Sequence, residues 1–422
     1  MGSNRRQIGW GLVDQGFSSA TNFGGSVLAA RMLSSHEFGG FAVGFSLYLI
    51  VLGLSRSWSS EPLMVRFAAA SREEQGEAIR QGAAASIAVG ATGGLALAAA
   101  SPVLWESVGR VLLATAVLLP ALTLQDYCRY ALIVRRRSRD AALNDLVWLV
   151  VLLVAFAGVR SQHLTATTAV VLWALGAIAA SALGLAQLHC LPAFASVVGW
   201  ARRQHDLSWR YSGEFVLLSG SAILLTVGLG AIGGLSDAAG FRGAQVALGP
   251  LGVLFMGATM QMTPIMVVAA RSGGERLRQI GRNISAVLGS FAGLWGTALL
   301  LIPDGVGAAL LGSSWSATRP LIPIWAAYYL ASGLASGATI GLRSSGAART
   351  SLRLRALVAP IGLTLGLLGA LLDGPRGASI GLLIGNAVAL PMWWRAFLKV
   401  CAAHGAAPMP EALTTGKAAR AL

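Results

Sequence analysis

Twelve apolar runs follow one another through this chain of 422 residues, each close to the 20 or so residues that an α-helix needs to cross a bilayer. Only 12% of the residues are charged and 55% are hydrophobic, whereas a soluble domain carries about 25% charged residues. We therefore predict an all-α polytopic membrane protein with twelve transmembrane helices. The predicted spans are 8–33, 38–58, 82–104, 108–134, 143–159, 167–188, 213–235, 243–269, 284–302, 320–342, 356–372 and 378–397.

The basic residues predict how these spans are oriented, because short cytoplasmic loops retain Arg and Lys while translocated loops lose them. With the N-terminus inside, the cytoplasmic segments and the adjoining helix ends hold 26 of the 32 basic residues. The predicted outer loops hold one each, namely Arg31, Arg110, Arg160, Arg242, Arg319 and Arg376. We therefore expect both termini in the cytoplasm. Scarce Lys beside abundant Ala and Gly indicates a bacterial protein, and hence the bacterial inner membrane.

Several chemistries are not expected from this composition. The net charge of +15 follows from the topology and from contact with anionic lipid heads, so no nucleic-acid partner is predicted. The three cysteines have no metal-ligand spacing and imply no disulfide framework. Neither Lys399 nor Lys417 is followed by Ser or Thr, so the chain has no lysine-containing phosphate loop for ATP hydrolysis. We predict neither enzymatic activity nor a metal site.

The two halves of the chain have similar residue patterns at a spacing near 200 residues, as in transporters built from repeats. We divide the chain into an N-terminal lobe of helices 1–6 (1–190), a cytoplasmic interfacial linker helix (191–212), a C-terminal lobe of helices 7–12 (213–400) and a short disordered cytoplasmic tail (401–422). Six helices per half give both lobes one orientation, so the pseudo-twofold axis runs along the membrane normal. A chance match between apolar segments is the alternative explanation of this similarity.

Polar residues inside the spans are the candidate functional groups, because ionisable side chains there usually face the bundle interior or a water-filled path. They are Asp14, Asn22, Arg56, Asp126, Arg129, Asp145, Glu214 and Gln245, with Glu61 and Arg66 just past the second span. Nearly all the charged ones lie in the cytoplasmic third of their helices. This placement favours a cavity that opens to the cytoplasm.

Arg56 is the first choice for a pyrophosphate contact, because guanidinium binds phosphate oxygens in a bidentate manner. Pro62 is expected to end or kink the second helix, so that Arg56 and Glu61 point to a common mouth. The alternatives are that Arg56 and Arg129 extend to the inner headgroups, and that Asp126 forms a local i, i+3 pair with Arg129. Asp145 is expected near the interface, in a structural role.

The residues that follow resemble those of one family. "VDQGFSSATNFGGSVLAARMLSSHEFGGFAVGFSLYLIV", "EPLMVR", "LLPALTLQDYCRYALIVRRRSRDAALNDLVW" and "LLGSSWSATRPLIP" look like segments of the polysaccharide biosynthesis (repeat-unit flippase) branch of the multidrug/oligosaccharidyl-lipid/polysaccharide exporter superfamily. The resemblance covers essentially the whole chain and is strongest in the first 150 residues. It distinguishes lipid-linked sugar flippases from drug exporters less sharply than it distinguishes both from major-facilitator transporters.

The resemblance implies a V-shaped, alternating-access carrier that moves an undecaprenyl-pyrophosphate-linked oligosaccharide to the outer leaflet. The head group would occupy a cavity lined by Asn22, Arg56, Glu61, Arg66, Asp126, Arg129 and Gln245, while the lipid tail stays in the membrane. Few arginines lie deep in the second half, which departs from the cationic cavity of the family. Partners would be membrane lipid, the lipid-linked glycan, and glycosyltransferases or a polymerase of the same pathway, with the carrier itself a monomer.

Asp14 and Glu214 correspond by position in the two halves, and we predict them as sites for a coupling H⁺ or Na⁺; no other cofactor is expected. A structural pairing at the inner interface is the alternative for both carboxylates. Three further functions remain open from the sequence. They are an ion-coupled drug or metabolite antiporter of the same superfamily, a polytopic glycan ligase or polymerase, and a non-transporting membrane scaffold.

Overall fold

A computed structural model describes residues 2–67, 70–103, 106–159 and 164–406, and within these ranges the regular structure is helical. The α-helices are α1 (Gly2–Met32), α2 (Ser35–Ser55), α3 (Glu61–Arg66), α4 (Arg72–Ala100), α5 (Glu106–Val134), α6 (Ser138–Gly158), α7 (Ala166–Leu188), α8 (Val197–Phe215), α9 (Ser221–Ile232), α10 (Leu235–Ala247), α11 (Gly249–Ser272), α12 (Gly274–Leu301), α13 (Asp304–Leu311), α14 (Trp315–Thr318), α15 (Ile322–Ser344) and α16 (Ala348–Ala406). Two π-helical segments matter below, η1 (Arg56–Ser60) and η4 (Val216–Gly220).

The prediction of an all-α, twelve-span membrane protein in two six-helix lobes is confirmed. The N-lobe consists of α1, α2, α4, α5, α6 and α7. The C-lobe consists of α9, the broken α10–α11 pair, α12, α15 and the two arms of α16, which bends at Asp373 and Gly374. Gly374 has a φ of +50° at this bend, a conformation that favours glycine.

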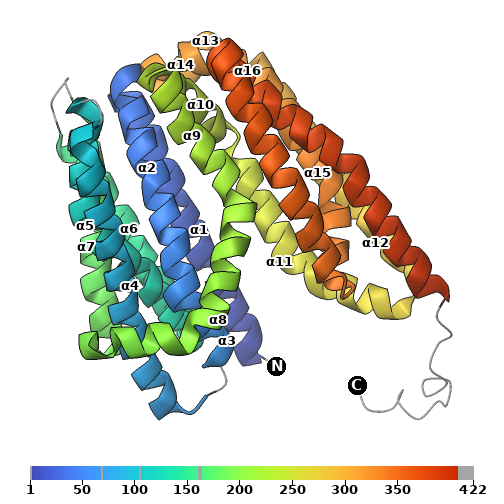
Figure 1. Cartoon of the computed structure of the whole chain (residues 1–422), viewed down its shortest axis with the longest axis horizontal. Helices are drawn as coiled ribbons and strands as arrows, with labels where there is room; N and C mark the ends of the chain where they lie inside the picture. Colours follow the sequence, from blue (N-terminus) through green and yellow to red (C-terminus); the bar gives the residue numbers. More distant parts are fainter. Residues whose placement is uncertain (1, 68–69, 104–105, 160–163, 407–422) are drawn as a thin grey trace.

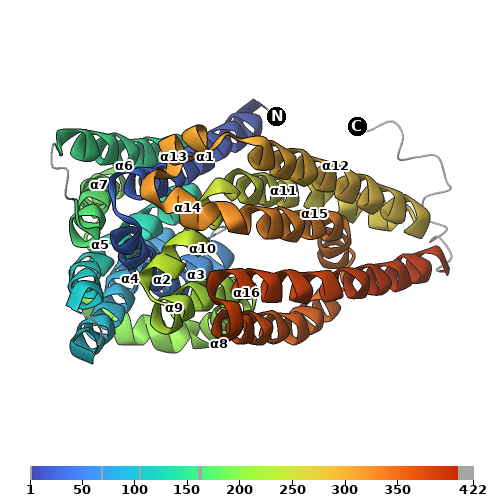
Figure 2. The same cartoon turned by 90° about the horizontal axis from the view of Figure 1, so that it is seen from above.

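The lobes form a V (Figure 1). They meet at one end, near α2, α10, α13 and α14, and separate towards the end where α1 begins and α16 finishes. We call these the closed end and the open end. Seen from above (Figure 2), α2, α9 and α10 lie between the bundle of α4–α7 and that of α12, α15 and α16.

Glycine makes the closed end tight. A Cβ on Gly39 of α2 would lie only 1.7 Å from the carbonyl oxygen of Leu235 at the start of α10, so the two backbones touch as small residues allow in membrane helices. The Ser35 hydroxyl donates to the Ser313 carbonyl at 3.1 Å, and the Ser313 hydroxyl donates to the Leu33 carbonyl at 3.3 Å. These contacts join the two lobes at the closed end.

The prediction that helix two ends at Pro62 is wrong, although Arg56 and Glu61 do line a common chamber, as predicted. The helix is continuous from Ser35 to Arg66, and its irregularity lies earlier, in η1, where the Glu61 amide donates to the Arg56 carbonyl. Two serine hydroxyls donate to carbonyls one turn earlier in this region: Ser57 donates to Gly53 and Ser59 to Ser55. Pro62 lies at the start of α3, and its missing N–H leaves the Trp58 carbonyl without a helical donor.

The eighth predicted span, which corresponds to α10 and α11, begins earlier than predicted. The span expected from residue 243 starts instead at Leu235, directly after Gly234 with a φ of +90°, and it breaks at Leu248 before α11. The run of Gly, Ala, Ser and Asp before residue 243 has loop-like composition, yet it is helical because small residues let α10 pack against α2. Arg242 therefore lies inside a helix and not in an outer loop.

The segment between the lobes forms α8, which runs across the open end beneath the N-lobe (Figure 1) and continues through η4 into α9. Its Trp200 indole donates to the Trp58 carbonyl of η1 at 2.8 Å. The domain limits at 190, 212 and 400 stay predictions. At the C-terminus α16 runs to Ala406, beyond the predicted start of the tail, while residues 407–422 and Arg160 lie outside the described residues.

Candidate functional site

Arg56 stands where three chambers between the lobes adjoin, since its side chain lines all of them. The N-lobe chamber, of about 690 Å³, is bounded by α1, α2, α5, α10 and α11. The C-lobe chamber, of about 450 Å³, is bounded by α2, α9, α10 and α15. The mouth chamber, of about 360 Å³, lies among Glu61, Tyr211, Glu214 and Arg343. Their volumes are in the range of small-molecule sites, about 300–1,000 Å³.

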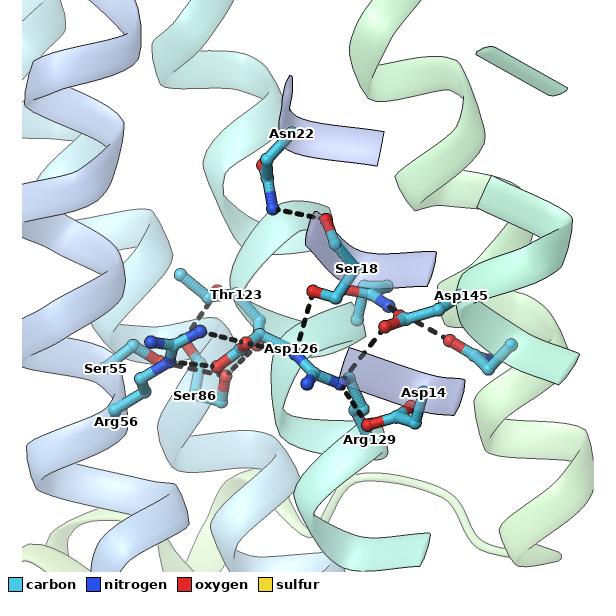
Figure 3. Close-up of polar contacts among 12 residues, drawn as sticks. Asp14, Ser18, Asn22, Ser55, Arg56, Ser86, Thr123, Asp126, Arg129 and Asp145 are labelled. Carbon is cyan, nitrogen blue, oxygen red and sulfur yellow. Dashed lines mark hydrogen bonds and ion pairs between the residues drawn. The ribbon is translucent and has the colours of Figure 1, made fainter. Parts of the chain in front are cut away.

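Arg56 and Asp126 form a bidentate ion pair (Figure 3). The Arg56 Nε donates to Asp126 Oδ2 at 2.8 Å and its Nη2 to Oδ1 at 2.7 Å. The π turn of η1 positions this arginine, and Asp126 projects from α5. The Asp126 side chain is 6% exposed, whereas that of Arg56 is 37% exposed. One edge of the guanidinium is therefore neutralised while the rest of the group faces the chambers.

Arg129 is held between two other carboxylates. Its Nε lies 3.0 Å from Asp14 Oδ2 and 3.1 Å from Asp145 Oδ2, and its Nη1 donates to the Ser18 hydroxyl at 3.1 Å. The carboxyl side chains are each 2% exposed and that of Arg129 is 10% exposed. Gln125 fixes Asp145 from below by donating to its Oδ1 at 2.8 Å. Buried charges of this kind require close partners.

These contacts decide between the sequence-based alternatives. Arg129 does not extend to the headgroups, because its guanidinium is enclosed by α1, α5 and α6. The local i, i+3 contact between Arg129 and Asp126 exists but is long, at 3.9 Å, and Arg56 is the main partner of Asp126. Asp145 pairs with Arg129 and its side chain is 2% exposed, which agrees with the predicted structural role, while its position near the interface stays a prediction. We call Asp14, Arg56, Asp126, Arg129 and Asp145 the N-lobe charge cluster.

Arg242 is the site residue that sequence analysis missed. Its guanidinium lies over the Phe45 ring, 4.6 Å from the centroid, and it donates to Gln245 Oε1 at 3.0 Å and to the Ser26 hydroxyl at 3.2 Å. Its Nε is buried without a hydrogen-bond partner. Both of these partners are neutral, and in the described part of the chain no carboxylate lies within ion-pair distance of Arg242. Arg242 lines both the N-lobe and the C-lobe chamber.

The remaining predicted site residues have different positions. Asn22 lines the N-lobe chamber, with its Oδ1 buried and without a hydrogen-bond partner, while Gln245 lines the chambers on either side of Arg242. Glu61 and Glu214 line the mouth chamber, where Glu214 lies 3.8 Å from Arg343. Arg66 lies away from these chambers and holds α8 through a bidentate contact with Asp206.

The N-lobe chamber combines charge with an apolar wall. The charged groups Arg56, Asp126 and Arg129 lie on its α2 and α5 side. Its α11 side carries Val253 and Met256, and α1 adds Phe23, all 40–41% exposed, beside the polar Ser18, Asn22 and Ser26 of α1. A ligand with a polar head and an apolar extension matches this division of the wall.

No protein-family model matches the chain, and no curated protein matches it. Solved structures do. An inward-facing multidrug resistance MATE family transporter of the MOP superfamily aligns with 93% of this chain and 98% of its own, at 13% identity and a TM-score of 0.70. The lipid II flippase MurJ in an inward closed conformation aligns with 93% of this chain and 90% of its own, at 11% identity and a TM-score of 0.68. An outward-facing MATE transporter aligns with 95% and 96%, at 15% identity and a TM-score of 0.58. The chain thus has the fold of MOP superfamily transporters.

Proposed function

We propose that the protein is an alternating-access flippase that carries an undecaprenyl-pyrophosphate-linked oligosaccharide repeat unit to the outer leaflet of the bacterial inner membrane. The observation that carries the proposal is Arg242. Its guanidinium is half-buried and is held only by neutral groups. Such a group attracts an anion strongly, because little water screens the charge. Arg56 presents its exposed edge to the same chambers, so a pyrophosphate between Arg242 and Arg56 would meet donors from both lobes.

The comparisons support transport and a direction of opening. The fold is shared with drug exporters and with a lipid II flippase, and the inward-facing exporter matches better than the outward-facing one, with TM-scores of 0.70 and 0.58. The open end also bears the Arg-rich segments between spans, which the positive-inside rule assigns to the cytoplasm. A lipid-linked head group would enter there and leave after the closed end has opened.

An ion-coupled drug or metabolite antiporter is the second candidate. It is favoured by the N-lobe charge cluster, where three carboxylates face two arginines, a balance that suits a cationic ligand or a coupling cation. Arg242 opposes it, because a drug cation in either large chamber would lie beside an uncompensated like charge.

The coupling ion is proposed for the same cluster. Asp14 Oδ1 is buried without a hydrogen-bond partner, which leaves an acceptor position for H⁺ or Na⁺ beside Arg129. Glu214, with 41% of its side chain exposed and Arg343 at 3.8 Å, resembles a surface pair more than a buried ion site. Asp14 is therefore the stronger of the two predicted coupling residues.

Flipping of a fluorescent undecaprenyl-pyrophosphate glycan by reconstituted protein tests the proposal. We expect R242Q to slow flipping about 10- to 100-fold, since a hydrogen bond to a charged group is worth about 1.5–3 kcal/mol. R319Q is the matched control, because Arg319 pairs with Asp304 at the closed end, outside the three chambers. Flipping by R242Q at the wild-type rate would contradict the proposed site. Efflux of a lipophilic cation without glycan flipping would establish the antiporter instead.

A further inference from the structure

We propose that the C-lobe chamber is a sugar subsite, in which Tyr328 and Tyr329, supported by Trp325, hold the ring attached to the pyrophosphate while Arg242 holds the phosphate. This inference rests on the proposed function, which it extends from the charged head to the first sugar. The chamber is the only one of the three that α15 lines with aromatic side chains.

The aromatic side chains share one face of α15. Trp325, Tyr328 and Tyr329 have the i, i+3, i+4 spacing that places side chains together on a helix, and all three line the chamber. The Trp325 and Tyr328 rings are 5.4 Å apart at 61°, and the Tyr328 and Tyr329 rings are 5.6 Å apart at 85°. The Tyr328 and Tyr329 rings are thus nearly perpendicular and form a corner in the lining of the chamber. We call these two rings the aromatic corner.

The corner is held rigidly from behind. The Trp325 indole donates to the Ser379 hydroxyl at 3.1 Å, a buried contact to the second arm of α16. Asn386 of the same arm donates to the Tyr328 carbonyl at 2.9 Å. Tyr328 and Tyr329 themselves are only partly buried, whereas Trp325 is 4% exposed. The two tyrosines are therefore the ligand-facing groups and Trp325 supports them.

Polar groups share the lining of the chamber with the aromatic corner. Gln245 accepts from Arg242 at 3.0 Å and approaches the Thr226 hydroxyl at 3.5 Å, and Ser46 of α2 lies on the same lining. A pyranose has one face of C–H bonds, which packs on the electron-rich face of an aromatic ring, and a rim of hydroxyls, which needs amide and hydroxyl partners. The chamber offers both kinds of surface at once.

Arg242 distinguishes a sugar phosphate from the other ligands that aromatic walls attract. Tyrosine faces also bind organic cations, but the neighbouring guanidinium repels them. A polyprenyl tail is disfavoured by the amide and hydroxyl groups, which it would leave without partners. A ligand with an apolar ring face, a hydroxyl rim and an adjacent anion satisfies every group that lines this part of the chamber.

Binding of paired probes to the purified full-length protein tests the subsite. The probes are citronellyl pyrophosphate without a sugar, and the same lipid carrying glucose or N-acetylglucosamine. We expect wild type to bind at least one sugar probe about 2- to 10-fold more tightly than the sugar-free lipid, as aromatic contacts predict. Y328L and Y329L should lose this preference and keep their affinity for the sugar-free lipid, while Y328F and Y329F, which retain the ring, should keep most of it.

The controls separate the subsite from the proposed function. F291L changes an exposed aromatic residue on α12, outside the lining of all three chambers, and should bind every probe as wild type does; monodisperse elution shows that each variant is folded. R242Q should weaken all probes alike. If neither sugar probe binds more tightly than the bare lipid, or if both leucine variants keep the preference, the subsite is refuted while the flippase proposal survives. If wild type binds no pyrophosphate lipid, both are refuted.

Discussion

Asp14 and Asp145 share Arg129 as their ion-pair partner, and this arrangement predicts how strongly the two carboxylates depend on each other for stability. One Nε–H lies 3.0 Å from the first carboxylate and 3.1 Å from the second, so either carboxylate alone can neutralise the guanidinium. D14N removes the hydrogen bond from Arg129 Nε to Asp14 Oδ2, and D145N removes a carboxylate oxygen that lies 3.1 Å from the same Nε without a hydrogen bond. Because the other carboxylate remains in each variant, we expect each to lower the free energy of unfolding by only about 1 kcal/mol.

The double variant D14N/D145N should behave differently. It leaves Arg129 buried, with Asp126 at 3.9 Å as its nearest remaining carboxylate, and Asp126 is already engaged by Arg56. Breaking a buried ion pair from one side costs about 3–5 kcal/mol. The double variant should therefore be destabilised by about 1–3 kcal/mol more than the sum of the single variants, which is the range of coupling between contacting residues.

Reversible unfolding in mixed micelles of mild detergent and dodecyl sulfate measures these differences. E275Q is a suitable control, because Glu275 forms an exposed pair with Arg278 in the first turns of α12 and exposed pairs are worth about 0–1 kcal/mol. Additive effects of D14N and D145N would refute the idea that one guanidinium serves both carboxylates. A single variant as damaging as the double would show that only that carboxylate matters.

Two further predictions concern the closed end and η1. G39V should prevent the closed end from closing, because even a Cβ at Gly39 would lie 1.7 Å from the Leu235 carbonyl oxygen. Distances between spin labels placed across the open end should therefore shorten. G24V is the control, because Gly24 has open space around it, and it should leave these distances unchanged. W200F removes the indole donor to the Trp58 carbonyl and should cost about 1–3 kcal/mol of unfolding free energy. A wild-type stability for W200F would mean that water satisfies this carbonyl.

Much of the fold could be predicted from the sequence because a bilayer leaves few choices. Span length and the placement of Arg are set by lipid, and both are visible in one dimension. The candidate arginines of the first half, Arg56 and Arg129, were found for the same reason: charge in an apolar run is conspicuous. The sequence does not show how the charges pair, because Asp126 meets Arg56, and Asp14 and Asp145 meet Arg129, from other helices and only after packing.

Arg242 was missed for a physical reason. The glycines and alanines around it are as typical of a loop as of a helix that touches another backbone, and only the packed structure distinguishes the two. An outer loop with the single basic residue Arg242 also agrees with the positive-inside rule, so the distribution of charge gave no sign that the residue lies in a helix. The signal that was available is Gln245, three residues later, which shares a helix face with Arg242 if the segment is helical.

The π turn η1 holds one residue more than an α-helical ladder would. Its five residues are Arg56–Ser60, and losing one of them would let the ladder close as an α-helix with little change in the orientation of α3. Losing a residue after η1 would instead rotate the rest of α3 by about 100° and turn Arg66 away from Asp206 on α8. We therefore expect gene variants of this protein to change length in the connections between helices and to keep the residue count between Glu61 and Arg66 constant.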